Sequence, residues 1–414
     1  MSVVTYAPDN TGTTDIVAPG AQERRSAIEA PAAYAIAHMT SLVALHLPGG
    51  PRFVEELTAA WDAGDAVLPL DVRLPEQAVR AIVDHVRPAT VVTASGDRHE
   101  LADALPLEEG DALVVATGGS TGELKAAILT HEAVQASATA SSRRLGVDPG
   151  RDRWLACLPL GHIGGMAVVT RAIVTGATLS VHDGFSAEAA VEDAKAGPTF
   201  VSLVPAALRR LDPSVFERVL LGGAAPPDSV PENAVVTYGM TETGSGIVYD
   251  GVPLDGVQVV LDDSGEIRVK GPMLLRAYRE GDDPHGYDPK SPNGWFHTGD
   301  AGWLDEDGRL HVRGRIAEVI VTGGEKVWPA AVERAISHHP GVADVAVAGV
   351  PDDAWGERVV AYVVASDGNP PSLGDLKSLV ADTIAPWAAP KELVLVDSLP
   401  RSPMGKLLKA QLSR

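Results

Sequence analysis

Short apolar runs rich in β-branched residues alternate with Ala-rich amphipathic stretches along the first 240 residues of the chain. Apolar runs of about four to eight residues are typical of strands buried on both faces, and the stretches between them have helical spacing. Strands separated by helices favour parallel sheets covered on both faces, which defines an α/β fold. The predicted strands are 41–47, 89–94, 111–117, 177–181, 198–204, 218–223 and 234–239. The predicted helices are 51–64, 75–88 and 131–146.

The pattern changes near residue 252. Apolar and polar residues alternate in VQVVLDDSGEIRVKG and GWLDEDGRLHVRGR, with Asp-Ser-Gly and Asp-Gly turns, which predicts antiparallel hairpins and a small β-barrel-like region. The last part of the chain mixes strand-like and helix-like segments and has a normal domain size. We therefore predict a large N-terminal domain, residues 1–315, made of αβ sandwich sheets and the barrel-like region. A small α+β domain, residues 316–414, follows it.

Charge and cysteine content limit the kinds of function. The 34 basic and 55 acidic residues give a net charge of −21, the reverse of a duplex-binding protein, so we expect no nucleic-acid partner. An anionic ligand would need a local cationic pocket in so acidic a chain. No apolar run reaches the roughly 18 residues of a membrane span, and the first residues lack the features of a signal peptide. The single Cys157 excludes a disulfide framework and a cysteine metal cluster, so we expect a cytoplasmic protein.

A glycine-rich run, TGGSTGELK, occupies residues 117–125 between a predicted strand and a predicted helix. Glycines allow backbone N–H groups to approach phosphate oxygens, Ser120 and Thr121 add hydroxyl donors, and Lys125 adds a positive charge. The run does not have the spacing of a P-loop. Taken alone, it fits a phosphate-binding loop and a polar turn equally well.

Three further segments carry residues that suit nucleotide chemistry. YGMTETG places Thr241, whose hydroxyl can bind phosphate, beside Glu242, whose carboxylate suits Mg²⁺. WFHTGDAGWLDEDGRLHVRGR contains Asp300, an acceptor for two ribose hydroxyls, and Arg315. LPRSPMGKLLK presents Lys406 in a loop bounded by proline and glycine. Each segment alone fits a solvated turn or a structural ion pair, so only their combination and order point to a function.

In this order, the residues resemble the adenylate-forming superfamily of acyl- and aryl-CoA synthetases, peptide-synthetase adenylation domains and luciferases. The resemblance runs from about residue 41 to the C-terminus. The motifs that carry it are TGGSTGELK, LPLGHIGG, LLGGAAPP, YGMTET, HTGDAGWLDEDG, GRIAEVIVTGGEKVWPAAVE and SPMGK. The resemblance implies a ligase that uses ATP and Mg²⁺ to convert a small carboxylic acid into an acyl-adenylate, and then passes the acyl group to coenzyme A. It also implies that the C-terminal domain is mobile and rotates between the two half-reactions.

The resemblance also implies roles for individual residues. The expected catalytic residues are Lys406, His162, Thr241 and Glu242, with Glu242 as the Mg²⁺ ligand. The residues expected to bind ATP or CoA are Thr117, Ser120, Thr121, Lys125, Gly222, Gly223, Ala224, Tyr238, Gly239, Met240, Asp300, Arg315, Gly323 and Gly324. Among them, Asp300 and Arg315 would hold the ribose, and Gly323 and Gly324 would flank the thiol tunnel. His162 would be either a gate between the acyl pocket and this tunnel or a packed structural residue.

The chain departs from the family pattern at three places. Leu124 and Ala126 flank Lys125 where the family has proline and glycine, and Ala317 stands at the hinge position where the family has Asp or Lys. The region before the phosphate loop is also short. This compact form most resembles the o-succinylbenzoate–CoA ligases, in which case Arg171 would pair with a second substrate carboxylate. The commoner role for such an arginine is a place on a helix surface.

Several functions stay open at this point. The acid could be o-succinylbenzoate or a bulky acid of secondary metabolism. The chain could perform only the thioester step, on an adenylate supplied by a partner adenylating enzyme. It could load a carrier protein in place of CoA, or act as a nucleotide-binding regulator without catalysis. The sequence does not decide whether the chain forms a homo-oligomer.

Overall fold

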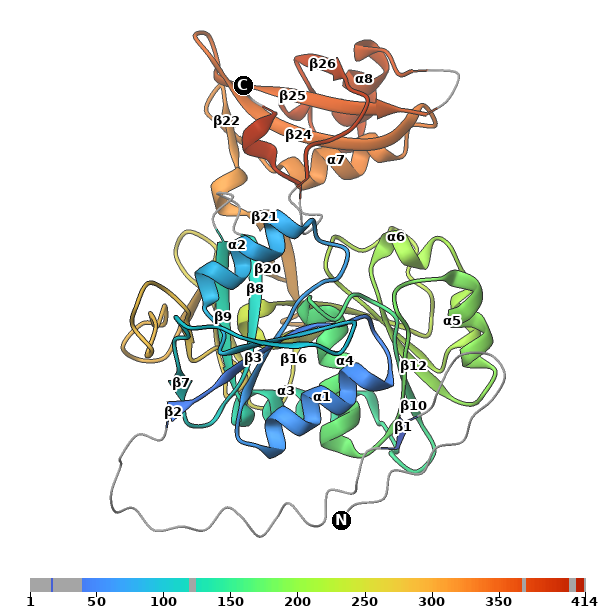
Figure 1. Ribbon diagram of the computed structural model, residues 1–414. Helices are drawn as coiled ribbons and strands as arrows, with labels where there is room; N and C mark the ends of the chain where they lie inside the picture. Colours follow the sequence, from blue (N-terminus) through green and yellow to red (C-terminus); the bar gives the residue numbers. More distant parts are fainter. Residues whose placement is uncertain (1–15, 18–38, 119–123, 367–369, 402–406, 413–414) are drawn as a thin grey trace. The chain divides into compact units, whose positions relative to one another are not determined.

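The computed structural model describes residues 16–17, 39–118, 124–366, 370–401 and 407–412 (Figure 1). The chain divides into two compact units, which are described separately below. Unit 1 comprises residues 1–117, 124–258 and 270–296, and unit 2 comprises residues 118–123, 259–269 and 297–414. This division by contacts groups the predicted barrel-like region with the C-terminal part. The functional division into 1–315 and 316–414 stays a prediction.

The first large sheet of unit 1 has eight strands in the order β1-β11-β10-β12-β13-β14-β15-β16. Its five central strands run parallel, as predicted; four of them are mostly buried, and the fifth, β14, is half-buried along its whole length. These strands are β10 (Arg153–Ala156), β11 (Thr178–Val181), β12 (Thr199–Leu203), β13 (Arg218–Leu221) and β14 (Ala234–Met240). Three strands at the two edges, β1 (Ile16–Val17), β15 (Ser245–Tyr249) and β16 (Val252–Pro253), pair antiparallel.

The second large sheet of unit 1 has seven strands in the order β19-β9-β8-β4-β3-β5-β6. The parallel pairs join β3 (Leu42–His46), β4 (Ala66–Pro69), β5 (Thr90–Thr93) and β8 (Asp111–Gly118). The other members are β6 (Arg98–Glu100), β9 (Leu124–Thr130) and β19 (Ala277–Tyr278). A separate two-stranded sheet joins β2 (Met39–Thr40) to β7 (Leu107–Glu108).

The sheets are mixed, whereas the apolar runs alone predicted parallel pairing. At the edge of the first sheet, a single turn of 3₁₀ helix, η3 (Thr241–Thr243), connects β14 to β15. So short a connection can only return the chain antiparallel, because a parallel crossover needs a dozen or more residues. The run of apolar residues therefore predicted the strands correctly but not the direction of the edge strand.

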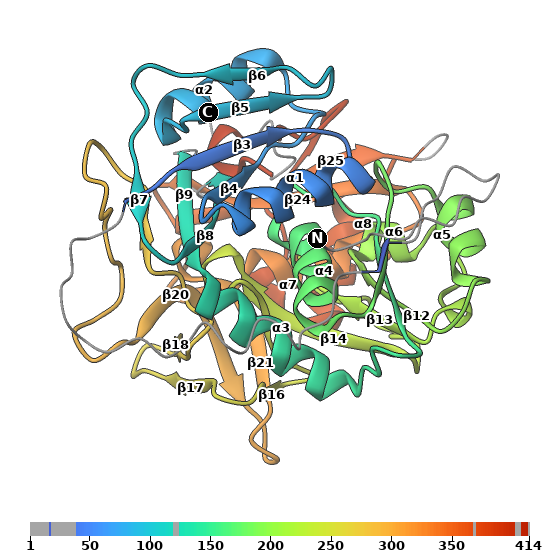
Figure 2. The ribbon, with the colours of Figure 1, turned by 60° about the horizontal axis from the view of Figure 1, so that its bottom comes forward.

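Helices α3 and α4 lie between elements of the two sheets. Helix α4 packs on β10, β11 and β12. Helix α3 packs on both α4 and β9 (Figure 2). Helix α3 begins where the Thr130 hydroxyl accepts a hydrogen bond from the Ala133 amide, and it ends at the left-handed Gly146. The helices of unit 1 are α1 (Pro51–Asp62), α2 (Glu76–Val86), α3 (His131–Leu145), α4 (Ile163–Thr175), α5 (Ala187–Ala194) and α6 (Pro205–Leu208). No described helix is long and apolar enough to cross a membrane.

Unit 2 contains two further sheets. The predicted hairpins form a four-stranded sheet of β17 (Gln258–Leu261), β18 (Glu266–Lys270), β20 (Phe296–Leu304) and β21 (Leu310–Arg315). The second sheet has five strands, β22 (Ile320–Thr322), β23 (Glu325–Val327), β24 (Val342–Asp352), β25 (Gly356–Ala365) and β26 (Glu392–Leu395). Helices α7 (Pro329–Ser337) and α8 (Leu373–Thr383) share a core with this sheet around Val332, Val347 and Leu376.

The single cysteine lies in the core of unit 1. Cys157 has no exposed surface and packs in a cluster with Leu155, Val201 and Leu221. Burial raises the pKa of its thiol to about 12. Because the thiolate is the reactive form, we expect the native protein to react with a disulfide reagent at pH 8 about 10³-fold more slowly than the unfolded protein. Absorbance of the released thiol, with and without urea, measures this. Equal rates in both states would show that the thiol is accessible.

Candidate active site

The YGMTETG segment forms a tight turn at the end of β14. The Thr243 hydroxyl donates to the Ser245 carbonyl oxygen at 2.6 Å and accepts from the Met240 amide at 2.9 Å. A Cβ atom at Gly239 would lie 2.1 Å from the Ser245 oxygen, so no other residue fits there. Gly244 adopts a left-handed φ of 63°. The turn thus holds Glu242, which is half-buried, in a fixed backbone.

Glu242, Tyr278 and Lys125 meet at one place in unit 1. The Tyr278 hydroxyl donates to Glu242 Oε1 at 2.6 Å, and Lys125 Nζ lies 5.2 Å from the centre of the Tyr278 ring. The structure therefore brings together the predicted metal ligand and the predicted phosphate-binding lysine. Tyr278 was not predicted as a site residue, because no local pattern of metal- or phosphate-binding residues marks its two-residue strand, β19.

Strand β9 explains how the phosphate-loop departures are accommodated. Lys125 is exposed near the start of the strand, whereas Ala126 and the three residues after it are buried in the sheet. Leu124 begins the strand, and Thr117, which is half-buried, lies near the end of β8. The predicted Ser120 and Thr121 lie outside the described residues.

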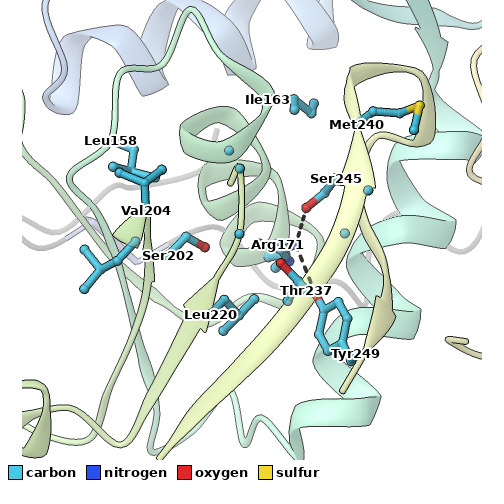
Figure 3. Close-up of a pocket in the computed structure, with 16 residues that line it drawn as sticks. Leu158, Ile163, Arg171, Ser202, Val204, Leu220, Thr237, Met240, Ser245 and Tyr249 are labelled. Atoms are coloured by element: carbon cyan, nitrogen blue, oxygen red, sulfur yellow. Dashed lines mark hydrogen bonds between the residues drawn. The ribbon is translucent and has the colours of Figure 1, made fainter. Parts of the chain in front are cut away.

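A cavity of about 130 Å³ opens between the ends of β12 to β15 and the start of α4 (Figure 3). Its wall is mostly apolar, with Leu158, Val204 and Leu220 among the larger side chains. The predicted Gly222, Gly223, Gly239 and Met240 also line it, whereas Ala224 and Tyr238 do not. A Cβ atom at Gly222 would lie 2.6 Å from Thr237 Oγ1, so this wall depends on a missing side chain.

Arg171 is a buried cation in the wall of this cavity. Only 2% of the residue is exposed, which excludes the helix-surface role. Its guanidinium donates to Ser245 Oγ at 2.6 Å and approaches Tyr249 Oη at 3.4 Å (Figure 3). It also donates to Ser141 Oγ at 2.9 Å. It also lies over the Trp154 ring, 5.4 Å from the ring centre. Among the described residues, no carboxylate lies within ion-pair distance of this guanidinium.

His162 caps the start of α4, and a third of its side chain is exposed. Its Nε2 lies 3.6 Å from Asp71 Oδ2. Asp71 also accepts hydrogen bonds from the Arg73 amide at 3.0 Å and the Arg73 guanidinium at 2.6 Å. Burial opposes the charge on Asp71, but hydrogen bonds from Arg73 and His162 outweigh it and hold its pKa well below the ordinary range. His162 is therefore a partly exposed ring beside a carboxylate, and not a packed core residue.

Asp300 and Arg315 face each other on paired strands of unit 2. Arg315 Nε lies 2.9 Å from Asp300 Oδ1, and its Nη1 donates to the Thr298 carbonyl oxygen at 2.9 Å. Asp300 is 7% exposed, and its backbone N–H donates to Thr298 Oγ1 at 3.1 Å. The two residues that the sequence assigned to one ribose therefore form an ion pair with each other.

Gly323 and Gly324 form the turn between β22 and β23, with left-handed φ values of 59° and 87°. A Cβ atom at Gly323 would lie 2.9 Å from the ring of Trp355, a residue that sequence reasoning missed. Trp355 is 46% exposed, and Lys391 Nζ lies 4.1 Å from its ring centre. Both the turn and the close approach of an aromatic ring require glycine here.

The hinge segment has an ionic partner that the sequence did not reveal. Ala317 is exposed within a turn of 3₁₀ helix, η4 (Ile316–Glu318). The adjacent Glu318 binds Lys409 Nζ at 2.9 Å, and Glu333 binds the same ammonium at 2.8 Å. Burial lowers the pKa of Lys409, but the two carboxylates outweigh burial and raise it above the ordinary 10.5. The predicted Lys406 lies outside the described residues.

Replacing Lys409 by methionine is expected to lower the free energy of unfolding of unit 2 by about 1–3 kcal/mol, because two half-buried carboxylates lose their partner. Because the pKa of Lys409 is raised in the folded state, its ion pairs stabilise the fold fully at any pH below the pKa of the unfolded state. The difference between Lys409→Met and wild type should therefore be constant from pH 7 to 9 and shrink above about pH 10.5. Urea denaturation of the full chain measures it, with the exposed Lys377→Met as control. A difference no larger than the control's would contradict the ionic role.

The described residues contain no cluster of three or more His, Cys, Asp or Glu side chains suited to a metal. Glu242 is instead a lone carboxylate. A lone carboxylate fits Mg²⁺ bound together with substrate phosphates, because this ion commonly keeps one or two protein carboxylates and takes its other oxygens from phosphate and water.

Comparison with known proteins agrees with the motifs. The AMP-binding enzyme family matches residues 102–279, and the AMP-binding enzyme C-terminal domain matches residues 331–406. A probable 2-succinylbenzoate–CoA ligase of Mycobacterium tuberculosis (strain H37Rv) is 42% identical over 332 residues, covering 74% of this chain and 85% of the relative. A 2-succinylbenzoate–CoA ligase of Geobacillus kaustophilus is 34% identical over 351 residues, covering 76% and 71%.

Solved structures agree with this result. The o-succinylbenzoate CoA synthetase (MenE) of Bacillus subtilis, in complex with the acyl-adenylate intermediate OSB-AMP, superposes with a TM-score of 0.81 at 27% identity, covering 90% of this chain and 88% of that one. The same enzyme in complex with ATP and magnesium ion superposes with a TM-score of 0.80 at 26% identity, covering 90% and 89%.

The α/β fold and the ordered motifs define an adenylate-forming enzyme, an acid–thiol ligase that forms AMP. This confirms the superfamily and the α/β fold predicted from the sequence. The chain belongs to the AMP-binding enzyme family and, within it, to the group of 2-succinylbenzoate–CoA ligases.

Proposed function

We propose that this chain converts 2-succinylbenzoate to its CoA thioester with ATP and Mg²⁺. The observation that carries the proposal is Arg171, a buried guanidinium in the wall of an apolar cavity. Burying a charge without a counterion is costly, and the described residues supply only hydroxyls and a ring. A dicarboxylic acid would supply the counterion with one carboxylate and keep the other for reaction.

In the first half-reaction, the free carboxylate of the acid attacks the α-phosphorus of ATP. The new P–O bond forms as the bond to pyrophosphate breaks. Thr117, Ser120, Thr121 and Lys125 grip the leaving phosphates, and Thr241 and Lys406 contact the α-phosphate. Glu242 would hold Mg²⁺, which would supply positive charge to the phosphates. Because two anions meet, catalysis here depends on positioning and charge neutralisation.

The adenylate is held while the second half-reaction takes place. The side chains of Asp300 and Arg315 hold the ribose, and the 222–224 and 238–240 segments contact the rest of the adenylate. The CoA thiol loses its proton and its sulfur attacks the acyl carbon, which breaks the C–O bond to AMP. Gly323 and Gly324 border the thiol's path, and His162 gates it. The exposed Trp355 and Lys391, next to Gly323, suit a nucleotide base and a phosphate of CoA.

We further propose that one chain performs both half-reactions in the cytoplasm, where ATP and CoA are held, without a partner adenylating enzyme. All the residues named above belong to one chain, and Ala126 fits the strand beside Lys125 without distortion. The buried, unpaired thiol of Cys157 suits a reducing compartment.

The test is a panel of carboxylic acids scored by mass spectrometry for acyl-CoA, AMP and pyrophosphate. The panel should include 2-succinylbenzoate, its analogue without the ring carboxylate, and bulky aromatic acids. We expect 2-succinylbenzoate to give the three products in equal amounts and to drive exchange of pyrophosphate into ATP. Turnover of a pre-made acyl-adenylate without exchange would instead indicate a thioesterification-only enzyme. Preference for a holo-carrier protein over CoA would indicate carrier loading.

A further inference from the structure

The backbone of Tyr278 is held by main-chain pairing with two other segments of the chain. In the sheet it pairs with Ala127 of β9, two residues after Lys125. Its amide and carbonyl exchange hydrogen bonds with Tyr287 at 2.8 and 2.9 Å. Three residues before Tyr278, the Leu275 amide donates a hydrogen bond to the Glu242 carbonyl oxygen at 2.7 Å. Main-chain hydrogen bonds therefore hold the backbone of Tyr278 against β9 and residue 287, and another ties the nearby Leu275 to Glu242.

Tyr278 contacts the negatively charged Glu242 and the positively charged Lys125 without neutralising either side chain. Its hydroxyl donates to Oε1 of Glu242 at 2.6 Å, and its face meets Lys125 at 5.2 Å from the ring centre. Among the described residues, Lys125 and Glu242 form no ion pair with each other or with any other side chain. A direct pair would neutralise the charge that each needs for a ligand. A neutral hydroxyl and a ring face orient both side chains and leave both charges intact.

We infer that Tyr278 is a positioning residue for the adenylation step, holding Glu242 and Lys125 apart and oriented for a divalent cation and a pyrophosphate group. This inference rests on the proposed function, since it concerns the same site. By donating to one carboxylate oxygen, the hydroxyl directs the other toward the ion. A group of this kind commonly changes metal affinity by about 10-fold or more when removed.

The first test replaces Tyr278 by phenylalanine, which keeps the ring over Lys125 and removes the hydrogen bond to Glu242. We expect the Mg²⁺ concentration for half-maximal pyrophosphate exchange to rise about tenfold at saturating ATP. The rate at high Mg²⁺ should return to near wild type. Calorimetry should show the same tenfold loss for Mg²⁺ binding in the presence of a non-hydrolysable ATP analogue. Thioester formation from a pre-made acyl-adenylate should not change.

A second variant and a control separate positioning from a fold effect. Tyr278→Leu also removes the ring face, so pyrophosphate should bind about threefold more weakly than to Tyr278→Phe. Tyr287→Phe is the matched control, because Tyr287 is the neighbouring paired residue and is 58% exposed. Superimposable Mg²⁺ titrations for wild type and Tyr278→Phe would overturn the inference while the proposed function stands. If wild type forms no adenylate with any acid, the proposed function fails, and the calorimetric comparison still decides the inference.

Discussion

Replacing Arg171 by methionine is expected to lower kcat/KM for 2-succinylbenzoate by about 10²- to 10³-fold. Truncating one partner of a buried charge pair commonly costs about 2–5 kcal/mol, and about 1.4 kcal/mol corresponds to tenfold. Methionine keeps the length and apolar character of the stem, so the cavity wall should stay intact. The steady-state rate of CoA thioester formation measures the effect.

The analogue without the ring carboxylate makes this test specific. Wild type should use the analogue poorly, since its cation would stay uncompensated, and Arg171→Met should lose little further activity on it. Arg171→Lys keeps the charge and should retain part of the preference for the dicarboxylate. Arg80→Met, at an exposed arginine of α2, serves as the control. Equal turnover of 2-succinylbenzoate by wild type and Arg171→Met would show that Arg171 serves packing alone.

Replacing Asp300 by alanine is expected to lower kcat/KM for ATP by about 10²-fold. Each hydrogen bond from a ribose hydroxyl to a carboxylate contributes about 1.5–3 kcal/mol, and the variant also leaves Arg315 without its partner. The distinctive result concerns the sugar. Wild type should prefer ATP to 2′-deoxyATP about tenfold or more, and Asp300→Ala should show almost no preference.

One control and one second site variant accompany the nucleotide comparison. Asp307→Ala changes an exposed carboxylate in the turn between β20 and β21. It should leave kcat/KM for ATP and for 2′-deoxyATP unchanged. Arg315→Met breaks the same ion pair from the other side and should weaken ATP binding while a reduced preference for the 2′-hydroxyl survives. If Asp300→Ala discriminates between the two nucleotides as wild type does, Asp300 does not hold the ribose.

The strands and helices could be predicted closely because burial on both faces leaves a plain sequence pattern. The runs at 111–117 and 198–204, for example, correspond to β8 and β12 within one residue at each end. The edge strand β19 could not be found in this way. It has two residues and is held by pairing with β9 and by a bridge to Tyr287, which no local pattern encodes.

The site residues also divide into those that a local pattern marks and those that it does not. Glu242 and Lys125 could be found because each belongs to a short continuous motif in the sequence. Tyr278 and the counter-charges of Lys409 act through partners more than 30 residues away, so they required coordinates. Arg171 is an intermediate case. The sequence raised it as a candidate, but only its burial without a carboxylate among the described residues separated a ligand role from a surface role.

The solitary, inaccessible sulfur of Cys157 makes the natural sequence a ready background for dye labelling. A thiol that reagents do not reach needs no prior removal, so two cysteines introduced at exposed positions, one in each unit, would be the only sites modified. Single-molecule energy transfer between such dyes could then follow the units through a catalytic cycle in otherwise unaltered protein.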